Sequence, residues 1–329
     1  MRLSITREVL HVKLHFVLHV NNIFFFTKHQ KLKSYVKITL MKNTNMKTDF
    51  QTIGLVLRKG KNLKKEYEKI KNAFLKFNAQ VVLDKESAET IGVDGVSEDE
   101  LYKISDLIIS LGGDGTLLGV CRTSYKYQKP ILGIHAGTLG FLTALQTYEI
   151  EDFIQNLYAG EYMIDERMLL KAILVKDGKE VIKSVAFNEV VFSRASISAT
   201  AKIEAYADGE HFNSYYGDGL ILSTPNGSTA YNLSAGGPIV LPQTPALIIT
   251  PICPHSLTQR PLVMFKEHEI TLSSKDDTVI VVDGQETYNM NDFDSLKVTF
   301  SKYTINLVCK KEQNFFKTLK DKLQWGSRE

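Results

Sequence analysis

The residue of this sequence best placed to do chemistry is an aspartate between glycines. Asp114 stands in the segment Gly112-Gly113-Asp114-Gly115-Thr116, after the apolar residues 108–111 and before a helix-forming stretch, residues 117–125. Glycines let an anion approach backbone N–H groups, and a helix N-terminus adds positive potential. A carboxylate there would repel phosphate unless it binds a metal or activates a hydroxyl group. The segment therefore predicts phosphoryl transfer, and the alternative is a tight turn with Asp114 as an N-cap.

A second stretch, residues 217–238, is dense in hydroxyl groups between two glycine pairs. Its polar side chains match the edge of a nucleotide base or the hydroxyl groups of a ribose. These side chains are Ser228, Thr229, Tyr231, Asn232 and Ser234. The alternative for this stretch is a polar surface loop.

A third signal is Asn188-Glu189, which interrupts the apolar strand expected over residues 185–192. Adjacent strand residues point to opposite faces, so one of the two side chains is expected to face inward at a buried polar site. A strand end or edge is the alternative. His135 is expected to be a loop residue, and His255 and Arg260 are expected to be structural.

The composition bounds the class of protein. The 329 residues are 43% hydrophobic and 23% charged, which is typical of a globular chain long enough for two domains. A net charge of +3, with lysines spread along the chain, argues against nucleic acid or a membrane surface as partner. The three cysteines, Cys121, Cys253 and Cys309, lack metal-ligand spacing and indicate a reducing compartment, so we expect a cytoplasmic protein.

The first 45 residues differ from the rest of the chain. Polar and charged residues interrupt each apolar run well before the roughly 18 residues of a membrane span, and no signal-peptide cleavage site follows. We expect residues 1–45 to be a disordered extension outside the fold, or an artefact of an upstream start codon. A membrane-tethering helix is the alternative.

Strands and helices alternate from residue 51 onward. Short apolar strands are expected at residues 53–57, 80–83, 106–111 and 130–134, and an amphipathic helix at residues 63–77. This order predicts a Rossmann-like parallel sheet covered on both faces, over residues 46–166. Ligands of such sheets lie beyond the carboxyl ends of the strands, where residues 112–116 and 135–141 are both expected.

The pattern changes near residue 167, where strands follow each other directly. Asp177-Gly178 and Asp208-Gly209 predict hairpin turns, and residues 167–308 are expected to form an antiparallel, sandwich-like β domain. Its expected strands are residues 169–175, 185–192, 202–207, 220–222, 270–272, 278–282 and 297–300. A last amphipathic helix, residues 314–323, is expected to return to the first domain, which would also include residues 309–329.

The three motifs together resemble the ATP-dependent NAD kinases, which make NADP. The glycine-rich segment is shared with lipid kinases, whereas Asn188-Glu189 and residues 217–238 are more specific. The resemblance covers residues 50–325 and includes the loop 135–142, Pro254-His255, residues 260–262, Asp283-Gly284-Gln285 and the stretch from Phe315 to Trp325. It implies a Rossmann-like domain, a β-rich domain and NAD in the cleft between them.

The resemblance also implies roles for individual residues. Asp114 would orient and deprotonate the 2′-hydroxyl of the adenosine ribose, and Asp218 would reach the dinucleotide of a neighbouring subunit. Tyr216 stands where many relatives have a basic residue. The remaining NAD contacts would be Gly115, Phe141, Asn188, Glu189, Thr229, Ala230, Tyr231, Asn232, Leu233, Ser234 and Gln285. The ATP phosphates would lie on Gly112, Gly113, Gly115 and Thr116.

No dedicated cluster of metal ligands is visible, so we expect a divalent ion, Mg²⁺, to be carried by the ATP phosphates and water. The expected assembly is a homodimer or homotetramer. Two alternatives to an NAD kinase remain: a lipid kinase of the diacylglycerol type that shares only the glycine signature, and a dinucleotide sensor without catalysis.

Overall fold

The computed structural model describes residues 15–19, 22–26, 50–137, 140–143, 145–324 and 326. The chain divides into two compact units, Met1–Met46 and Lys47–Glu329. In the first unit, β1 (His15–His19) and β2 (Asn22–Phe26) pair as an antiparallel hairpin. The rest of the predicted extension lies outside the described residues, and the domain boundaries predicted from the sequence stay predictions.

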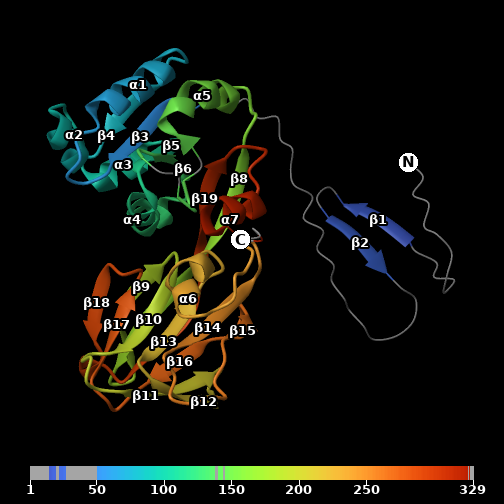
Figure 1. Cartoon of the computed structure of the whole chain (residues 1–329). Coiled ribbons are helices and arrows are strands. Elements are labelled where there is room, and N and C mark those ends of the chain that lie inside the picture. The colour runs from blue at the N-terminus through green and yellow to red at the C-terminus, as the bar shows by residue number, and fades with distance from the viewer. Residues whose placement is uncertain are drawn as a thin grey trace. The chain divides into compact units, whose positions relative to one another are not determined.

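A parallel sheet forms the first part of the second unit (Figure 1). Its strands, all paired in parallel in the order β4-β3-β5-β6, are β3 (Thr52–Leu57), β4 (Gln80–Leu83), β5 (Leu107–Gly112) and β6 (Pro130–His135). Its helices are α1 (Lys64–Leu75), α2 (Lys85–Ile91), α3 (Glu98–Ile104), α4 (Asp114–Ser124) and α5 (Ile150–Tyr158). The predicted parallel sheet is confirmed.

Helices cover both faces of this sheet because its strands alternate buried side chains between them. Ile53 and Leu55 of β3 pack in one buried cluster with Phe74 of α1 and Phe153 of α5. The opposite face packs Ile108 and Ile131 against apolar residues of α3 and α4. The chain runs from β3 outward to β4 and then crosses back to β5. The topological switch point, where open α/β sheets bind ligands, therefore lies between β3 and β5.

The second part of the unit is β-rich, as predicted. One antiparallel sheet has the order β15-β14-β13-β10-β17-β18. Its strands are β10 (Glu189–Arg194), β13 (Gly219–Ser223), β14 (Ala246–Ile252), β15 (Leu262–Phe265), β17 (Thr278–Val282) and β18 (Glu286–Asn289). Buried residues such as Phe192, Leu222 and Ile280 pack from this sheet against Leu170 and Leu272 of the facing one. The two sheets thus enclose a single core.

The facing sheet is continuous with the parallel sheet, in the order β12-β11-β16-β19-β6-β5-β3-β4. Two long strands make this connection: β8 (Met163–Lys176) and β19 (Ser295–Cys309) pair antiparallel, and β19 also pairs in parallel with β6. The other strands are β7 (Leu145–Gln146), β9 (Lys179–Ala186), β11 (Ala201–Ala207), β12 (Glu210–Gly217) and β16 (Ile270–Ser273). The sequence did not predict this continuity.

Both predicted hairpin turns are confirmed. Asp177 and Gly178 have positive φ angles of 50° and 70°, and Asp208 and Gly209 of 51° and 85°. Positive φ at both central residues matches the right-handed twist of the strands that the turns join, β8–β9 and β11–β12.

Short helices complete the fold. α6 (Tyr231–Ser234) follows β13, and the predicted C-terminal helix is α7 (Phe315–Leu323), which Asn314 caps. Just before α7, Lys310 and Lys311 pair with Glu149 and Glu161, which flank α5. Trp325, the last residue of the stretch that resembles the NAD kinases, lies outside the described residues. Single turns of 3₁₀ helix are Tyr125–Tyr127, Thr147–Glu149, Gly227–Thr229 and Met290–Asp292.

The single strand predicted over residues 185–192 was wrong. The chain breaks at Phe187 and Asn188, where it leaves β9 in one sheet and enters β10 in the other. At the break, the backbone N–H groups of Phe187, Asn188 and Glu189 donate to the buried carboxylate of Asp283 at 2.7–2.9 Å. A side chain thus replaces a neighbouring strand as the acceptor, which makes the change of sheet possible without unpaired N–H groups.

Candidate active site

Asp114 is the first residue of α4, two residues beyond the carboxyl end of β5. Its Oδ2 accepts the backbone N–H of Phe141 at 2.7 Å, and its Oδ1 accepts those of Leu142 and Thr143 at 3.2 and 3.3 Å. Gly140 lets this loop come so close, since a Cβ there would lie 2.0 Å from Oδ1. Asp114 is thus held in one orientation by the loop, and the alternative of a side-chain N-cap is not seen in α4. Thr138 and Leu139 of the same loop lie outside the described residues.

The glycines around Asp114 differ in what they do. Gly115 is exposed, and a Cβ built on it would meet no atom within 4 Å, so the space beside it at the start of α4 is open. Gly113 is half-buried, and a Cβ built on it would lie 3.4 Å from His135 Nε2, which is ordinary contact distance. Neither residue has a positive φ. These two glycines therefore provide open space beside a helix N-terminus, and neither is needed for an unusual backbone turn.

Gly112 requires a correction. It was predicted to contact phosphate, but it is a buried residue at the end of β5. A Cβ there would lie 2.2 Å from Thr116 Oγ1 and 3.0 Å from Cβ of Arg58. Gly112 therefore makes room for neighbouring protein side chains, which fixes where Thr116 sits. His135, expected in a loop, is the last residue of β6, and its Nδ1 is buried without a partner in the described structure.

Two cations that the sequence reading missed lie at the same edge of the sheet. Arg58 follows β3 directly, donates its backbone N–H to Leu111 O at 2.8 Å and is exposed. Lys61, three residues later, donates from Nζ to Ala136 O at 3.3 Å, next to the end of β6. Both therefore flank the switch point beside Gly113 and Gly115. The basic run Arg58-Lys59-Gly60-Lys61 after a buried strand was the signal that could have found them.

Asn188 and Glu189 stand where the chain passes between the sheets. Asp283, from the turn between β17 and β18, holds their backbone N–H groups, and its own N–H donates to Glu189 O at 3.0 Å. Phe187 packs in the same buried cluster as Leu117 and Leu118 of α4. The segment is therefore fixed against the helix that begins with Asp114.

Glu189 is a buried acid, only 7% exposed, and its Oε2 has no hydrogen-bond partner in the described structure. Burial raises the pKa of Glu189 from 4.5 to about 8; the nearby Asp283 carboxylate adds to the rise, and the Tyr231 backbone N–H partly offsets it. Burial also raises the pKa of Asp283, against the lowering effect of the three N–H groups and of Arg122. A buried acid with a raised pKa and an oxygen free to form a hydrogen bond is a candidate ligand contact.

The hydroxyl-rich loop, residues 224–238 after β13, lies directly against the Asn188-Glu189 segment. Thr224 donates its N–H to Asn188 O at 2.8 Å and its hydroxyl to Phe187 O at 2.7 Å. Gly227 is required at the crossing, since a Cβ there would lie 2.3 Å from Asn188 O. Within the predicted set, Tyr231 and Ser234 are exposed, and Thr229, Ala230 and Leu233 are half-buried. The structure thus brings residues 229–234 together with Asn188 and Glu189.

Asn232 is the exception within that loop. Its side chain is fully buried: Nδ2 donates to Ser228 O and Pro238 O at 3.2 and 3.1 Å, and Oδ1 accepts from the Thr250 hydroxyl at 2.6 Å. The predicted contact of this side chain with NAD is therefore corrected. Asn232 instead anchors the loop to β14.

Arg122 joins the two halves of the site, and the sequence reading missed it. It lies on α4 two turns after Asp114, and its guanidinium is buried. It pairs with Asp283 at 3.4 Å and with Glu286 at 2.5 Å, and donates to Gln285 Oε1 at 3.1 Å and to Val185 O at 3.2 Å. The helix of Asp114 is therefore tied to the acid that holds Asn188 and Glu189.

Asp218, a predicted NAD contact, lies elsewhere. Asp218 precedes β13 and pairs with Arg194 at 3.0 Å, at the opposite end of that strand from the hydroxyl-rich loop. Nearby, exposed Tyr216 packs edge-on against His255, with ring centroids 5.4 Å apart. Gln285 is engaged with Arg122. Among the described residues, no contact joins Asp218 or Tyr216 to Asp114, Asn188 or Glu189.

A resident metal does not fit the residues present. In the described part of the chain, no three His, Cys, Asp or Glu side chains come together as ligands. The oxygens of Asp114 both face backbone N–H groups, which would leave a cation poorly placed on them.

The structure also describes no helix long and apolar enough to cross a membrane. All three cysteines are free.

A parallel sheet carrying an aspartate at its glycine-rich turn, joined to a β-sandwich with a buried acid, is the architecture of a phosphotransferase. Comparison with known protein families identifies the kind of phosphotransferase. The N-terminal domain of ATP-NAD kinases matches residues 53–162, and their C-terminal domain matches residues 187–309. The chain belongs to the ATP-NAD kinase family.

Individual relatives belong to the same family. A protein of Campylobacter jejuni strain 81-176 named NAD kinase is 45% identical over 287 residues, which cover 87% of this chain and all of that protein. An NAD kinase of Sulfurimonas denitrificans is 43% identical over 276 residues, 83% of this chain and 97% of the relative. Yeast NADH kinase complexed with NADH superposes with a TM-score of 0.79 at 25% identity, over 96% of this chain and 95% of that one.

An NAD kinase from Archaeoglobus fulgidus in complex with ATP shares the fold, with a TM-score of 0.68 at 24% identity, over 83% of this chain and 99% of that one.

Proposed function

We propose that this chain transfers the γ-phosphate of ATP to the 2′-hydroxyl of the adenosine ribose of NAD, giving NADP. The observation that carries the proposal is the environment of Asp114. A carboxylate offers about four acceptor positions, and backbone N–H groups of the described loop take three of them. Among the described residues, Oδ2 accepts only from Phe141, which leaves one position for a hydroxyl donor.

Asp114 would act late in the reaction. Phosphoryl transfer has a loose transition state in which alignment and charge neutralisation contribute more than a strong base. The three N–H groups fix the direction of the carboxylate, so Oδ2 can orient the ribose hydroxyl and accept its proton as the phosphate arrives. The first N–H groups of α4, which have no partners within the helix, would stabilise the phosphate charge, with Arg58 and Lys61 nearby.

The acceptor would bind on the β-rich side of the site. Asn188 and Glu189 would hold the adenosine of NAD, with residues 229–234 supplying hydroxyl groups and surface for the rings. Because burial raises its pKa to about 8, Glu189 would carry a proton at neutral pH and would donate a hydrogen bond from its unpartnered oxygen. Phe141 and Gly115 would border the ribose, and Gln285 would act through Arg122. Asp218 would contact a dinucleotide only across a subunit interface.

We propose that the divalent ion, Mg²⁺, arrives bound to the ATP phosphates and water, because the described residues offer no cage for it. The protein is proposed to be a homodimer or homotetramer, since Asp218 lies apart from the other predicted contacts. Three free cysteines support a cytoplasmic location.

A coupled assay tests this function. The purified chain is incubated with NAD and Mg-ATP, and an NADP-specific dehydrogenase reports the product. We expect NADP to form and Asp114→Asn to reduce turnover by about 10²–10⁴-fold while NAD still binds. No NADP from ATP, other nucleotides or polyphosphate would refute the proposal.

A further inference from the structure

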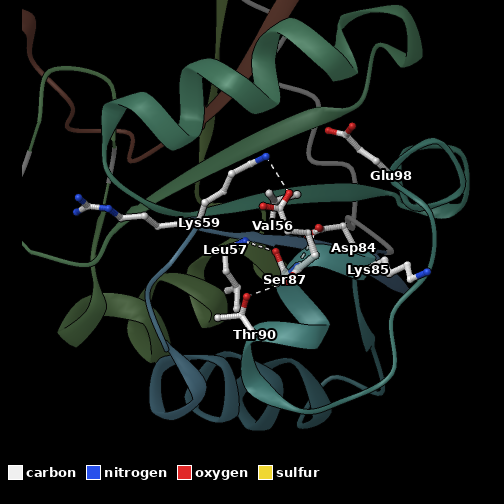
Figure 2. A pocket seen from close by; sticks show the side chains of 10 residues that line it. Val56, Leu57, Lys59, Asp84, Lys85, Ser87, Thr90 and Glu98 are labelled. Carbon is white, nitrogen blue, oxygen red and sulfur yellow. Dashed lines mark hydrogen bonds and ion pairs between the residues drawn. The ribbon is translucent and has the colours of Figure 1, made fainter. Parts of the chain in front are cut away.

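The polar groups of the parallel sheet and the hydroxyl-rich loop are held in place in different ways. At the carboxyl ends of β3 and β4, a pocket of about 260 Å³ is lined by side chains that bind one another (Figure 2). Leu57 donates its N–H to the Ser87 hydroxyl at 2.8 Å, 30 positions away, and Lys59 pairs with Glu86 at 2.8 Å. The hydroxyl-rich loop is instead held by residues farther away in the sequence, and one set of these contacts is a buried cluster on β8.

Asp165 and Arg167 form a buried ion pair on β8. They are 7% and 6% exposed, and Arg167 Nη2 lies 2.5 Å from Asp165 Oδ2. Their side chains lie on the same face of the strand because the two residues are two positions apart. Moving two charges out of water is costly, and apolar residues of similar volume are often just as stable in their place. Stability alone therefore does not explain the pair, and its other partners indicate its role.

The ion pair holds the hydroxyl-rich loop at both ends. Arg167 Nη1 donates to Oδ1 of Asn226, which lies near the start of the loop and is 5% exposed. Gln243, which follows the loop, donates from Nε2 to Asp165 Oδ1 at 2.9 Å. Arg167 Nε has no hydrogen-bond partner among the described residues, so the hydrogen bonds of Nη1 and Nη2 set the orientation of the guanidinium.

Asn226 fixes the turn that leads into residues 229–234. Its carbonyl accepts the Thr229 hydroxyl at 3.3 Å. The next residue, Gly227, crosses the Asn188 backbone so closely that a Cβ on it would lie 2.3 Å from Asn188 O. The loop therefore cannot move toward Asn188, and the hydrogen bond from Arg167 prevents Asn226 from moving away.

The strand that carries the ion pair also connects the two parts of the unit. Asp165 pairs with Leu307 of β19, and Leu307 pairs in parallel with Ile131 of β6. β6 leads into the loop whose N–H groups, at residues 141–143, hold the carboxylate of Asp114. The ion pair is therefore anchored to the same sheet that positions Asp114.

We propose that Arg167 is a positioning residue for the acceptor. Through Asn226 it holds residues 229–234 where the adenosine of NAD binds, and through β8 it sets that place relative to Asp114. A guanidinium suits this role because its planar fork directs several hydrogen bonds at fixed angles, which a lysine ammonium does not. This inference rests on the proposed function and adds to it the residue that aligns the acceptor.

Two substitutions at Asn226 form a matched pair. Asn226→Leu has a similar size and removes the acceptor of Arg167, so the KM for NAD should rise at least about tenfold, as expected for the loss of one hydrogen bond to a charged group. The KM for ATP should stay within about twofold, because the loop lies on the acceptor side of the site. Asn226→Asp keeps an oxygen for Arg167 and should leave the KM for NAD within about threefold of its original value.

Variants of Arg167 test the same hydrogen bond from the other side. Arg167→Lys keeps the charge beside Asp165 but loses the fork, and it should raise the KM for NAD about as much as Asn226→Leu does. The double variant should raise it no further, since both changes remove one contact. Phe74→Ala in α1, where the ring is fully buried, is the stability control. It should lower the thermal midpoint and change neither KM.

Three results would overturn the proposal. The first is a lower thermal midpoint of Asn226→Leu with an unchanged KM for NAD, as a merely structural contact would give. The second is an equal rise of the KM for NAD in Asn226→Asp, or an equal rise of the KM for ATP in Asn226→Leu. The third is an additive effect of Asn226→Leu and Arg167→Lys.

Calorimetric binding of NAD in the absence of ATP makes the test independent of turnover. Weaker binding to Asn226→Leu than to both the unmodified chain and Asn226→Asp supports the role of Arg167. Equal binding to all three proteins, or no binding to any of them, overturns it. Absence of NADP from the unmodified chain would refute the proposed function alone, so the two failures are distinct.

Discussion

Glu189 shows how burial changes a single residue. Its pKa is raised from 4.5 to about 8, so the folded chain keeps the proton while the unfolded chain releases it between those two values. Stability from this group is therefore complete below pH 4.5, falls as pH rises and is lost above about pH 8. We predict that Glu189→Gln, compared with the unmodified chain, is stabilised by on the order of 2–4 kcal/mol at pH 9 and not at pH 4.5.

Urea unfolding at the two pH values checks this prediction. Equal differences in the free energy of unfolding at both would show that Glu189 does not titrate in this range, and the account of its burial would fail.

Gly140 sets the position of Asp114. A Cβ at residue 140 would overlap the carboxylate, with 2.0 Å to Oδ1, so Gly140→Ala must displace either Asp114 or its loop. We predict a loss of turnover of at least about 10²-fold, as misplacement of a catalytic group by an ångström produces. The control is Gly119→Ala in α4, where a Cβ meets nothing within 4 Å. It should stabilise the chain by about 0.5–1 kcal/mol and leave turnover unchanged; equal activity of both variants would contradict the steric argument.

Residue types and spacing identified Asp114, Asn188 and Glu189, because carboxylates and amides in apolar or glycine-rich settings are unusual. Residue types and spacing did not identify the side chains that hold these three residues in place. Arg122 meets Asp283 and Gln285 more than 160 positions along the chain, and no local pattern encodes such a partner. For the same reason the burial of Asn232 in α6 was missed, since its partner Thr250 is on β14, 18 positions away.

At the scale of elements, α4 and the β17–β18 turn are joined by one buried ion pair, Arg122 with Asp283. Removing one partner leaves the other charge buried, which costs about 3–5 kcal/mol. We predict that Arg122→Met lowers the free energy of unfolding by this amount and reduces kcat more than it changes the KM for ATP. Arg122→Lys should restore part of both.

A double-mutant cycle with Asp283→Asn tests whether the two residues act together. Their coupling energy, from urea unfolding, should be about 0.5–3 kcal/mol. Additive effects would show that the helix and the turn are stabilised independently.

Elements were predictable where local signals were complete. Apolar runs and the two Asp-Gly turns located most strands, since each signal lies within a few residues. The strand expected over residues 185–192 failed because its break depends on Asp283, nearly 100 positions away. Strands β12, β14, β15 and β18 were not predicted, and β19 proved far longer than residues 297–300 because β8 and β6 both pair with it.

At the scale of the whole molecule, the second unit contains every residue assigned to the reaction, and the family matches begin at residue 53. We predict that a chain starting at Met46 keeps the specific activity and thermal midpoint of the full chain within error. Parallel measurements on the two proteins check this, and a loss of more than about half of the activity would show that the first unit contributes to the site.

The central claim is that Asp114 directs the γ-phosphate of ATP to one hydroxyl of NAD. The most direct test uses ATP labelled at the γ-phosphate, with NAD and Mg²⁺, and locates the label in the product by phosphorus NMR. The account predicts label only on the 2′-hydroxyl of the adenosine ribose, and almost none with Asp114→Asn. Label at another position, or full transfer by Asp114→Asn, would contradict it.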